Sequence, residues 1–590
     1  MKIVPPLLVA GMGLTVLVTP AAAADYFIQA QTPGPVMGSA LNAISLQATT
    51  EKSTAKETGT EESLRTRSAI VVSPAKAKWT RARREGESSA GTSDEPFSTG
   101  GETATGGETT TGGASGFGGT TEGGGTAEGG STTESGGTTE GGSTTEGGST
   151  GGTTDTSGGT STGGTSTGGT STGGSTGNTV VAPTPVSVSG PAPTISASQT
   201  YRSFDALVQS NKLTGGDRVF FLDGYHGPLV VDGLKFASPV LIAAMPGQVA
   251  HVDGISVRTS AKIIFQGLKV WPTAAQPGPG DIIRSMSDTS DLVFQNLDVR
   301  AIPTAATYVQ WTAADWNNNK RSAFQIDGVR QMVLGNRTTG TFHGVQVSGP
   351  NAYVEGNIID GFSGDGLRAL GDNTIVRRNK VQNCVNVFAT HEDGIQAWSR
   401  GPTGKPGTGT MRNLTIEDNK FLEWVSPQVS ALRCKLQGIS LFDGMFDGFI
   451  IRNNVISSTH YHGITINGAL NTEIVNNTVV DINGHKNKWP WIMLSPHKNG
   501  TPSKNVDIAN NIAMQIKAKT NPTLGYTVTN NVIPGSIFND FTAPGNQDYT
   551  LKSGSSAIDK GNAAYAPKDD LMGAARPKGK APDAGAYENF

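Results

Sequence analysis

The sequence predicts an all-β fold, a single-stranded right-handed parallel β-helix, from two repeated features. The first is a phrase of a polar residue, Gly, an apolar β-former and a second polar residue. Its five copies are His343-Gly344-Val345-Gln346, Asp365-Gly366-Leu367-Arg368, Asp393-Gly394-Ile395-Gln396, Gln437-Gly438-Ile439-Ser440 and His462-Gly463-Ile464-Thr465. The second is an Asn that ends a following apolar run, with intervals of 21 and 22 residues between Asn336, Asn357 and Asn379 and of 23 between Asn454 and Asn477. A fixed period of about 22 residues indicates a solenoid.

A repeat of that size cannot bury its own apolar face, so successive repeats must stack. Stacking puts equivalent residues into columns at the strand spacing of about 4.8 Å. Asn suits a bend in such a column because it tolerates the left-handed backbone and its amide can bond the amides above and below. We therefore interpret the repeated Asn residues as a structural ladder and not as catalytic groups.

The chain divides into three predicted parts. Residues 1–24 have a charged start at Lys2, an apolar stretch and the ending Ala22-Ala23-Ala24, which is typical of a secretory signal. Residues 25–194 are rich in Gly, Thr, Ser and Glu and predict a disordered linker. Residues 195–590 form the β-helix domain. An uncleaved N-terminal anchor is the alternative for the first part, but no later run is long enough to span a membrane.

Both ends of the predicted β-helix need covering, because a parallel solenoid otherwise exposes strand edges and core. At the start, Ser203 can cap a short helix within 201–211 whose apolar face carries Phe204, Leu207 and Val208. The first strands are expected at 218–222 and 228–231. At the far end, the segment 549–590 is expected to pack as the second cap.

Composition limits the partners of this protein. The 590 residues carry 46 Lys and Arg against 49 Asp and Glu, a net charge of −3, which gives no reason to expect nucleic acid or an acidic membrane surface. We expect one folded domain, secreted as a monomer. The only cysteines, Cys384 and Cys434, follow their ladder positions at different distances, which favours two buried thiols over a disulfide.

The opening Thr214-Gly215-Gly216-Asp217, the Asn ladder and the closing segments Ala557-Ile558-Asp559-Lys560-Gly561 and Pro582-Asp583-Ala584-Gly585-Ala586-Tyr587-Glu588 together resemble exported β-helix proteins of the pectate-lyase-like superfamily. The resemblance implies a polysaccharide lyase, a uronate epimerase, a hydrolase or a protein without a reaction. Polygalacturonase carboxylate motifs are not evident. Thr390-His391-Glu392-Asp393 stands only loosely where alginate epimerases have Asp-Pro-His.

Alternation along the strands predicts a groove for a glycan. With the apolar residue of each phrase facing the core, the next residue faces outward. A partly aromatic row follows two positions later: Ser348, Leu370, Trp398, Phe442 and Asn467. Amides and guanidinium groups can bond hydroxyls and carboxylates, while aromatic faces pack on sugar rings. The predicted substrate-binding residues are Gln346, Gln396, Trp398, Ser440, Phe442 and Arg433. Insertions at 399–412 and 425–436 would wall this groove.

The predicted reaction removes the proton α to the carboxylate of a uronic acid unit, which requires a cation and a base. We assign Arg368 as the cation, His391 or His462 as the base, and Lys435 as a reserve. Asp365 and Asp393 could hold a calcium ion if the Gly bend turns them outward; otherwise they cap backbone amides at the turn. An acidic polysaccharide is the expected partner. The alternatives are a non-catalytic glycan-binding surface protein and, third, a glycoside hydrolase that uses Asp365 and Asp393.

Overall fold

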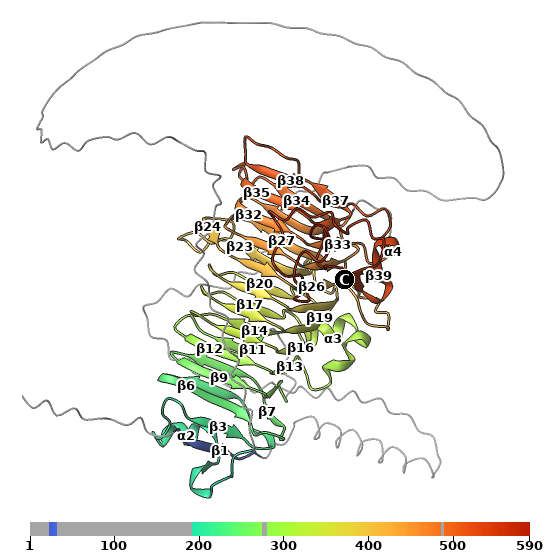
Figure 1. The fold of residues 1–590 in the computed structure, drawn as a ribbon. Coiled ribbons are helices and arrows are strands. Elements are labelled where there is room, and N and C mark those ends of the chain that lie inside the picture. Colours follow the sequence, from blue (N-terminus) through green and yellow to red (C-terminus); the bar gives the residue numbers. More distant parts are fainter. Residues whose placement is uncertain (1–22, 32–191, 274–279, 485–488, 590) are drawn as a thin grey trace, which may run out of the picture. The chain divides into compact units, whose positions relative to one another are not determined.

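The computed structural model describes residues 23–31, 192–273, 280–484 and 489–589. These belong to one compact unit made of residues 1–55 and 174–590. Nearly all of the predicted signal segment and most of the predicted linker lie outside the described residues. Three parallel sheets stack their strands from β3 to β38 (Figure 1).

Sheet A contains, in spatial order, β2 (Thr200–Tyr201), β1 (Asp25–Ile28), β3 (Arg218–Phe221), β6 (Lys235–Ala244), β9 (Ala261–Gln266), β12 (Ser290–Gln295), β15 (Met332–Leu334), β18 (Tyr353–Glu355), β21 (Ile375–Arg377), β25 (Thr415–Glu417), β29 (Ile450–Arg452) and β32 (Ala469–Val475). From β32 it continues to β28 (Met445–Asp447) with β24 (Thr410–Arg412), and to β35 (Lys504–Ala509) with β38 (Tyr526–Thr529).

Sheet B contains β4 (Gly224–Tyr225), β7 (Ala250–Val252), β10 (Lys269–Val270), β13 (Asp298–Arg300), β16 (Arg337–Thr341), β19 (Ile358–Phe362), β22 (Lys380–Cys384), β26 (Lys420–Leu422), β30 (Val455–Ser457), β33 (Thr478–Val480) and β36 (Ile512–Ala513). Sheet C contains β5 (Leu229–Asp232), β8 (Ile255–Arg258), β11 (Gly280–Ser285), β14 (Arg321–Ile326), β17 (Val345–Val347), β20 (Leu367–Ala369), β23 (Asp393–Trp398), β27 (Gln437–Asp443), β31 (His462–Asn467), β34 (Trp491–Ser495) and β37 (Gln515–Lys517).

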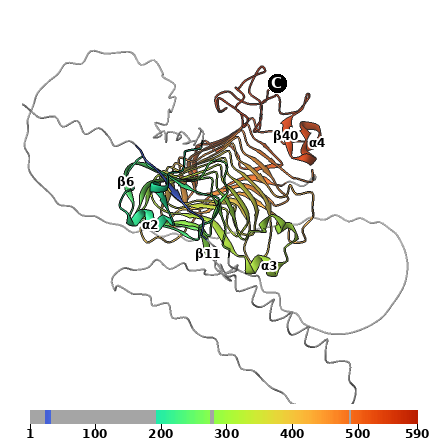
Figure 2. The same cartoon turned by 90° about the horizontal axis from the view of Figure 1, so that it is seen from below.

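Helices and short 3-10 turns lie outside this stack. The helices are α2 (Phe204–Gln209), α3 (Ala313–Asn318) and α4 (Ile537–Asp540), and the 3-10 turns are η1 (Ala197–Gln199), η2 (Ala305–Gln310) and η3 (Pro544–Asn546). An antiparallel pair, β39 (Phe541–Ala543) and β40 (Asp548–Leu551), follows α4. Seen from below, α3, α4 and β40 lie on the outside of the stacked strands (Figure 2). In the described part of the chain, no helix has the length and hydropathy to cross a membrane.

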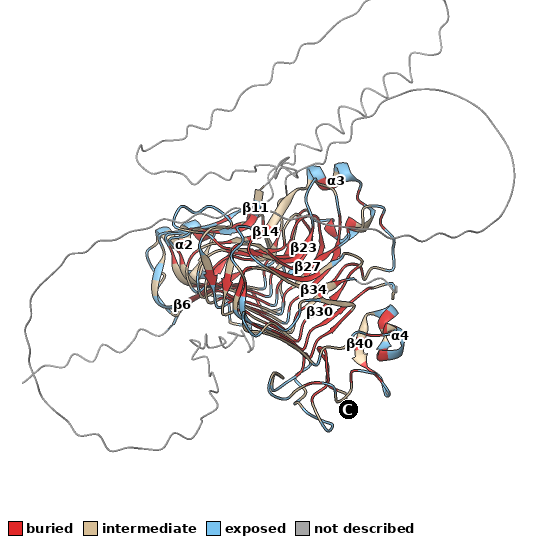
Figure 3. Ribbon diagram, turned by 90° about the horizontal axis from the view of Figure 1, so that it is seen from above, coloured by how far each residue is buried: buried red, intermediate tan, exposed pale blue. Residues whose placement is uncertain are grey.

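Apolar side chains from all three sheets fill the inside of the stack, where Figure 3 shows the buried residues. The apolar residue of every repeated phrase is buried there: Val345, Leu367, Ile395, Ile439 and Ile464. The Gly of the phrase has a packing reason. A Cβ on Gly366 would lie 2.3 Å from Val381 Cγ1, and one on Gly438 would lie 2.2 Å from the carbonyl oxygen of Gly463. Only Gly lets each bend approach both the next bend and the side chains of sheet B.

The predicted Asn ladder is confirmed, with one correction. In Asn379, Nδ2 donates to Asn419 Oδ1 at 3.0 Å, while Oδ1 accepts the Nδ2 of Asn357 at 2.9 Å. The same pattern runs through Asn336, Asn357, Asn379, Asn419, Asn454, Asn477, Asn511 and Asn531. However, the left-handed backbone belongs to the residue before each ladder Asn, such as Arg378 at φ 54°. The left-handed bend and the ladder hydrogen bonds are therefore made by two adjacent residues and not by one Asn.

The N-terminal end also differs from the prediction. The helix α2 forms as expected, with Ser203 accepting from the N–H of Ala206 and with Phe204 and Leu207 buried. But Asp25–Ile28, at the start of the predicted linker, is strand β1 and pairs with β3 and β2. The backbone N–H of Ala24 donates to buried Asp217 at 2.8 Å. The first rung therefore takes a strand from a segment about 170 residues earlier in the chain.

Two further expectations are wrong. The segment 549–590 packs on the flank of sheet B, where Tyr549 and Tyr587 join Val455 and Ile512 in one buried cluster, instead of covering the far end of the stack. The two cysteines are joined in a disulfide with Cα atoms 5.4 Å apart. The cause is the insertion after β26, which folds back so that the N–H of Cys434 donates to the carbonyl oxygen of Cys384.

Candidate functional site

A row of polar residues runs along sheet C in the predicted order, although Gln346, Ser440 and Thr465 are buried. Successive register pairs join Gln346 to Arg368, Arg368 to Gln396, Gln396 to Ser440 and Ser440 to Thr465. The same row extends back to Arg284 and forward to Lys517. Because parallel strands are about 4.8 Å apart, neighbours in this row can share hydrogen bonds or one extended ligand.

The bend at each Gly turns the preceding polar residue toward this row. Arg368 Nε donates to Asp365 Oδ2 at 2.5 Å, and Thr465 Oγ1 lies 2.7 Å from His462 Nδ1. Ser440 and Gln437 make a longer contact of the same kind, at 3.5 Å. Each pair spans three residues, a spacing that would put side chains on opposite faces of a straight strand. The phrase therefore builds two adjacent polar columns on one face.

Five residues of adjacent rungs form what we call the central cluster: Asp365, Arg368, His391, Asp393 and Ser440. Asp365 Oδ1 accepts the backbone N–H of Asp393 at 3.2 Å. One oxygen of Asp393 accepts Ser440 Oγ at 2.6 Å, and the other lies 3.0 Å from His391 Nδ1. Both aspartates are buried, whereas 55% of the His391 side chain is exposed. A buried carboxylate thus orients an imidazole that solvent can reach.

Charge and burial shift the protonation of this pair. Hydrogen bonding to Asp393 raises the pKa of His391 to about 9. Burial raises the pKa of Asp393, although its bond with His391 opposes that shift. A buried carboxylate beside an imidazolium is stabilised as an ion pair. When Nδ1 donates to Asp393, Nε2 is the ring nitrogen that can exchange a proton with a ligand.

The buried acid Glu392 belongs to the same environment, and the sequence assigned it no role. Its two carboxylate oxygens lie 3.0 and 3.1 Å from Asn386 Nδ2. Burial raises the pKa of Glu392 to about 8, with the charges of Asp365 and Asp393 adding to the effect. The run of three titratable residues, His391-Glu392-Asp393, was the signal available in the sequence.

Beyond the central cluster, His460, Tyr461 and His462 form a stack of rings at the bend before β31. The His460 and Tyr461 ring centres are 4.1 Å apart, and those of Tyr461 and His462 are 4.3 Å apart. Burial lowers the pKa of His460 to about 4 and that of His462 to about 3. The charge of His391 contributes to both shifts, which places the stack beside it. His462 is therefore a neutral and weakly basic ring near neutral pH.

The remaining predicted site residues lie around the central cluster or away from it. The Arg368 guanidinium lies 5.4 Å from the ring centre of Trp398, and the Phe442 ring lies 5.0 Å from that of His462. Lys435 is exposed, and its charge helps to lower the pKa of His460.

Arg433 is engaged elsewhere. Its Nη2 donates to buried Glu423 at 2.6 Å, and Glu423 also accepts from the backbone of Thr459. The ion pair joins the long insertion to the bend before β31, which gives Arg433 a structural role at this corner.

The described residues do not gather as a metal site. Both oxygens of Asp365 and of Asp393 already accept or share hydrogen bonds within the protein. Across the described ranges, no group of three or more His, Cys, Asp or Glu side chains is placed to hold a metal ion. The two carboxylates therefore do not fit the expected calcium ion.

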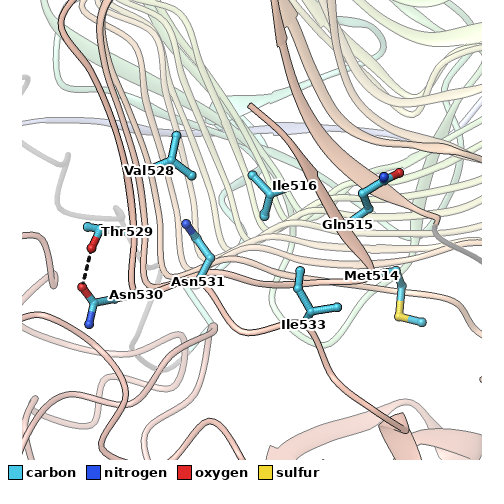
Figure 4. A pocket seen from close by; sticks show the side chains of 8 residues that line it. All are labelled: Met514, Gln515, Ile516, Val528, Thr529, Asn530, Asn531 and Ile533. Carbon is cyan, nitrogen blue, oxygen red and sulfur yellow. Dashed lines mark hydrogen bonds between the residues drawn. The ribbon is translucent and has the colours of Figure 1, made fainter. Parts of the chain in front are cut away.

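A separate pocket of about 480 Å³ lies at the C-terminal end of the stack (Figure 4). Its lining includes Gln515, Ile516, Val528, Asn531 and Ile533. From β20 to β37 there are five strand spacings, so this pocket is about 24 Å from Arg368. It occupies the end that the C-terminal segment leaves uncovered.

Comparison with known proteins bears on this architecture. A family model described as "Right handed beta helix region" matches residues 306–556, which include the central cluster. This part of the chain is a right-handed parallel β-helix. The predicted right-handed parallel β-helix is thereby confirmed, including its handedness. No curated protein sequence matches the chain.

The β-helix is similar to several solved structures at low identity. Pectate lyase Pel9A is 12% identical, with 66% of this chain and 92% of that chain covered and a TM-score of 0.32. The alginate lyase AlyGC of family PL6 is 16% identical, with 56% and 50% covered and a TM-score of 0.28. The A-module of mannuronan C-5 epimerase AlgE6 from Azotobacter vinelandii is 13% identical, with 54% and 94% covered and a TM-score of 0.20. Likeness at this level carries no argument about the reaction of this chain.

Proposed function

We propose that the central cluster on sheet C acts on an acidic polysaccharide by removing the proton α to a uronate carboxylate. One observation supports this most: Arg368 and the His391–Asp393 pair belong to one hydrogen-bonded cluster on adjacent rungs. A cation and an oriented base are the two groups that the reaction needs.

Arg368 is the group that neutralises the sugar carboxylate. Its Nε donates a hydrogen bond to Asp365, and its Nη1 donates one to Gln346 Oε1 at 3.4 Å. Its Nη2 makes no hydrogen bond with any residue that the structure describes. A guanidinium oriented at one edge keeps donors for a second carboxylate. As negative charge moves from the α carbon toward the substrate carboxylate, Arg368 stabilises the transition state.

His391 is the proposed base. In its neutral form, Nε2 takes the proton from C5 of the uronate. The electron pair of the broken C–H bond then forms a C4–C5 double bond while the C4–O bond to the neighbouring sugar breaks, and the leaving oxygen takes a proton from solvent water. Without that elimination, return of a proton to the opposite face of C5 inverts the centre. The neutral fraction of His391 rises with pH toward its raised pKa, so the reaction should favour alkaline conditions.

Hydrolysis is the less favoured chemistry here. A retaining pair needs two carboxyl groups that can reach the scissile bond, one of them as a nucleophile. Asp365 and Asp393 are 3% and 0% exposed, and their oxygens are used by Arg368, His391, Ser440 and a backbone N–H. Binding without reaction remains the second candidate, because the Asp365–Arg368 bond gives the guanidinium a structural partner too.

The proposal is tested by incubating the purified protein with alginate, pectate and glycosaminoglycans over a range of pH. An unsaturated product, seen by its ultraviolet absorption, marks elimination, and exchange of the C5 proton with deuterated solvent without cleavage marks epimerisation. New reducing ends without unsaturation would instead identify a hydrolase. Binding of these polymers with neither product would leave a glycan-binding protein.

We further propose that the protein is exported. Strand β1 begins at Asp25, directly after the predicted signal segment, and the Cys384–Cys434 disulfide is a bond that oxidising compartments favour. N-terminal sequencing of protein from the culture medium and the periplasm tests this, and a full-length chain found only in the cytoplasm would contradict it.

A further inference from the structure

Strand β1, blue in Figure 1, connects the first strands of sheet A. In the order of that sheet it lies between β2 and β3 and pairs with both. Its Tyr26 and Ile28 side chains are buried in the core, and the Phe27 ring stacks on the ring of Phe220 with centres 6.1 Å apart. The segment that directly follows the predicted signal is therefore an integral part of the folded domain.

The carboxylate of Asp217 is buried beside the start of β1, and Asp217 is only 1% exposed. Its Oδ2 accepts the backbone N–H and the hydroxyl of Thr214 at 2.7 and 3.0 Å, and its Oδ1 accepts the N–H of Ala24 at 2.8 Å. The neighbouring Arg218 pairs with Asp25 instead. Within the described ranges, no Lys, Arg or His side chain forms an ion pair with Asp217. A buried carboxylate without a cation is costly, because neutral donors replace its hydration only in part.

A cut between Ala23 and Ala24 would supply that cation. In the uncut chain, the donor to Asp217 is a neutral amide. On hydrolysis, the oxygen of a water molecule bonds to the carbonyl carbon of Ala23 and the C–N bond breaks. The two protons of the water end on the Ala24 nitrogen, which becomes an ammonium, and Ala23 becomes a carboxylate. Ala24 is partly exposed, so the N–H bonds that do not point at Asp217 can reach water. Hydrogen bonds between two charged groups are about twice as strong as neutral ones.

The sequence permits two cleavage positions, and the structure distinguishes between them. Alanines stand one and three positions before the cut at both Ala23–Ala24 and Ala24–Asp25, as a signal peptidase requires. The second cut would remove the donor to Asp217 and also the Ala24 carbonyl oxygen, which accepts the N–H of Arg218 at 2.9 Å. Ala23, by contrast, is exposed and makes no hydrogen bond in the described part of the chain. The fold therefore needs Ala24 and not Ala23.

We propose that a signal peptidase cuts this chain between Ala23 and Ala24, and that the new Ala24 ammonium forms an ion pair with buried Asp217 that fixes β1 in the first rung. Processing then does more than release the chain, because it also neutralises a buried charge at the N-terminal end of the β-helix. For the cut, this inference rests on the proposed export. It does not rest on the proposed reaction.

The cut is tested by N-terminal sequencing and intact-mass measurement of the exported full-length protein. The expected first residue is Ala24, with a free amino group. An exported chain that begins at Asp25 or at any other residue would overturn the inference while the export stands. A chain that is found only in the cytoplasm with residues 1–23 still attached would contradict both.

The ion pair is tested separately, with two forms of the protein. One begins with Ala24, and in the other Gly-Ser-Gly precedes Ala24, so that its nitrogen stays an amide. Hydrogen exchange of the β1 amides measures how often the strand opens. With Asp217 in place, the form that begins with Ala24 should open roughly tenfold less often, because only this form has the charge-assisted bond. Equal exchange in the two forms would overturn the ion pair, and this comparison needs no substitution.

Asp217→Asn then identifies the partner of the ammonium, because it keeps an oxygen acceptor and removes the charge. It should raise the opening constant of β1 roughly ten- to a hundredfold in the form that begins with Ala24, but less than about threefold in the extended form. Asp205→Asn is the matched control, since Asp205 is an exposed aspartate on the nearby helix α2. It should act equally in both forms. Equal effects of Asp217→Asn in the two forms would mean that Asp217 is not the partner.

Discussion

The imidazole Nδ1 of His391 lies 3.0 Å from Oδ2 of Asp393, and the second oxygen of that carboxylate accepts Ser440 Oγ at 2.6 Å. The exposed His391 ring is thus oriented by the fully buried Asp393 carboxylate. Ser440 on the next rung in turn orients that carboxylate by a hydrogen bond. The pair is two residues apart in the chain, yet its geometry depends on the bend at Gly394 and on Ser440, 47 residues later.

This pair predicts how activity depends on pH. If neutral His391 is the base, turnover should increase as pH rises toward about 9, where half of the imidazole has lost its proton. Asp393→Asn removes the partner that raises this pKa, so the rising limb should move to lower pH, with a lower plateau from poorer orientation. Initial rates between pH 5 and 10.5 measure both changes. An unchanged profile in the variant would exclude the pair as the titrating group.

Glu392 predicts how stability depends on pH. Its pKa is raised from 4.5 to about 8 in the folded state, so the folded protein binds the proton more tightly than the unfolded chain. Stability should therefore fall as pH rises from about 4.5 to 8, by a few kcal/mol at most. In Glu392→Gln, the melting temperature should depend less on pH between about 4.5 and 8, and at pH 8 it should be higher than that of the parent. The same substitution at exposed Glu473 should change neither.

Arg368 predicts a selective loss of activity. Arg368→Lys should lower turnover roughly ten- to a thousandfold, because a lysine ammonium cannot keep the Asp365 bond and also donate two parallel bonds to a carboxylate. The melting temperature should change little, because lysine keeps a positive charge beside the buried Asp365 carboxylate. Arg284→Lys, in the same outward row on β11, is the matched control and should retain full activity. Full activity of Arg368→Ala would mean that the reaction takes place elsewhere.

The Asn ladder predicts a cost in stability. Asn379 makes side-chain bonds to Asn357, Asn419 and the carbonyl oxygen of Val354, all buried. Asn379→Ala should lower the free energy of unfolding by about 1–3 kcal/mol, because its partners lose hydrogen bonds without gaining water. Asn317→Ala on the exposed face of α3 should stay within about 0.5 kcal/mol of the parent. Urea titrations compare the two. Equal midpoints would remove the ladder's assigned role.

The disulfide predicts sensitivity to reduction. Cys384 and Cys434 are 50 residues apart. A disulfide that closes a loop of that length lowers the entropy of the unfolded chain and stabilises the fold by about 3–4 kcal/mol. The double variant Cys384→Ser with Cys434→Ser should therefore unfold at lower temperature, and dithiothreitol should lower the parent's melting temperature but not the variant's. A parent protein with two titratable thiols as isolated from its cell would contradict the bond.

By itself, the sequence determined the stacking of the chain. The Gly, Asn and alternating apolar positions recur at a fixed period, and such local patterns decide which residues face the core and which share a column. The row from Gln346 to Ser440 could therefore be predicted in order and in register, as could the Asn ladder.

Only the tertiary structure decided how side chains meet across that row and which distant segments complete it. The turn of Asp365 toward Arg368 depends on a Gly bend pressed against Val381. The entry of Asp25–Ile28 into the first rung, the disulfide and the capture of Arg433 by Glu423 each join segments across loops. The entropic cost of closing a loop grows only slowly with its length, so contacts between distant segments can form. Each of these contacts occurs once, so it leaves no periodic signal in the sequence. The central cluster needed both: columns set by the repeat, and side-chain directions set by contacts between rungs.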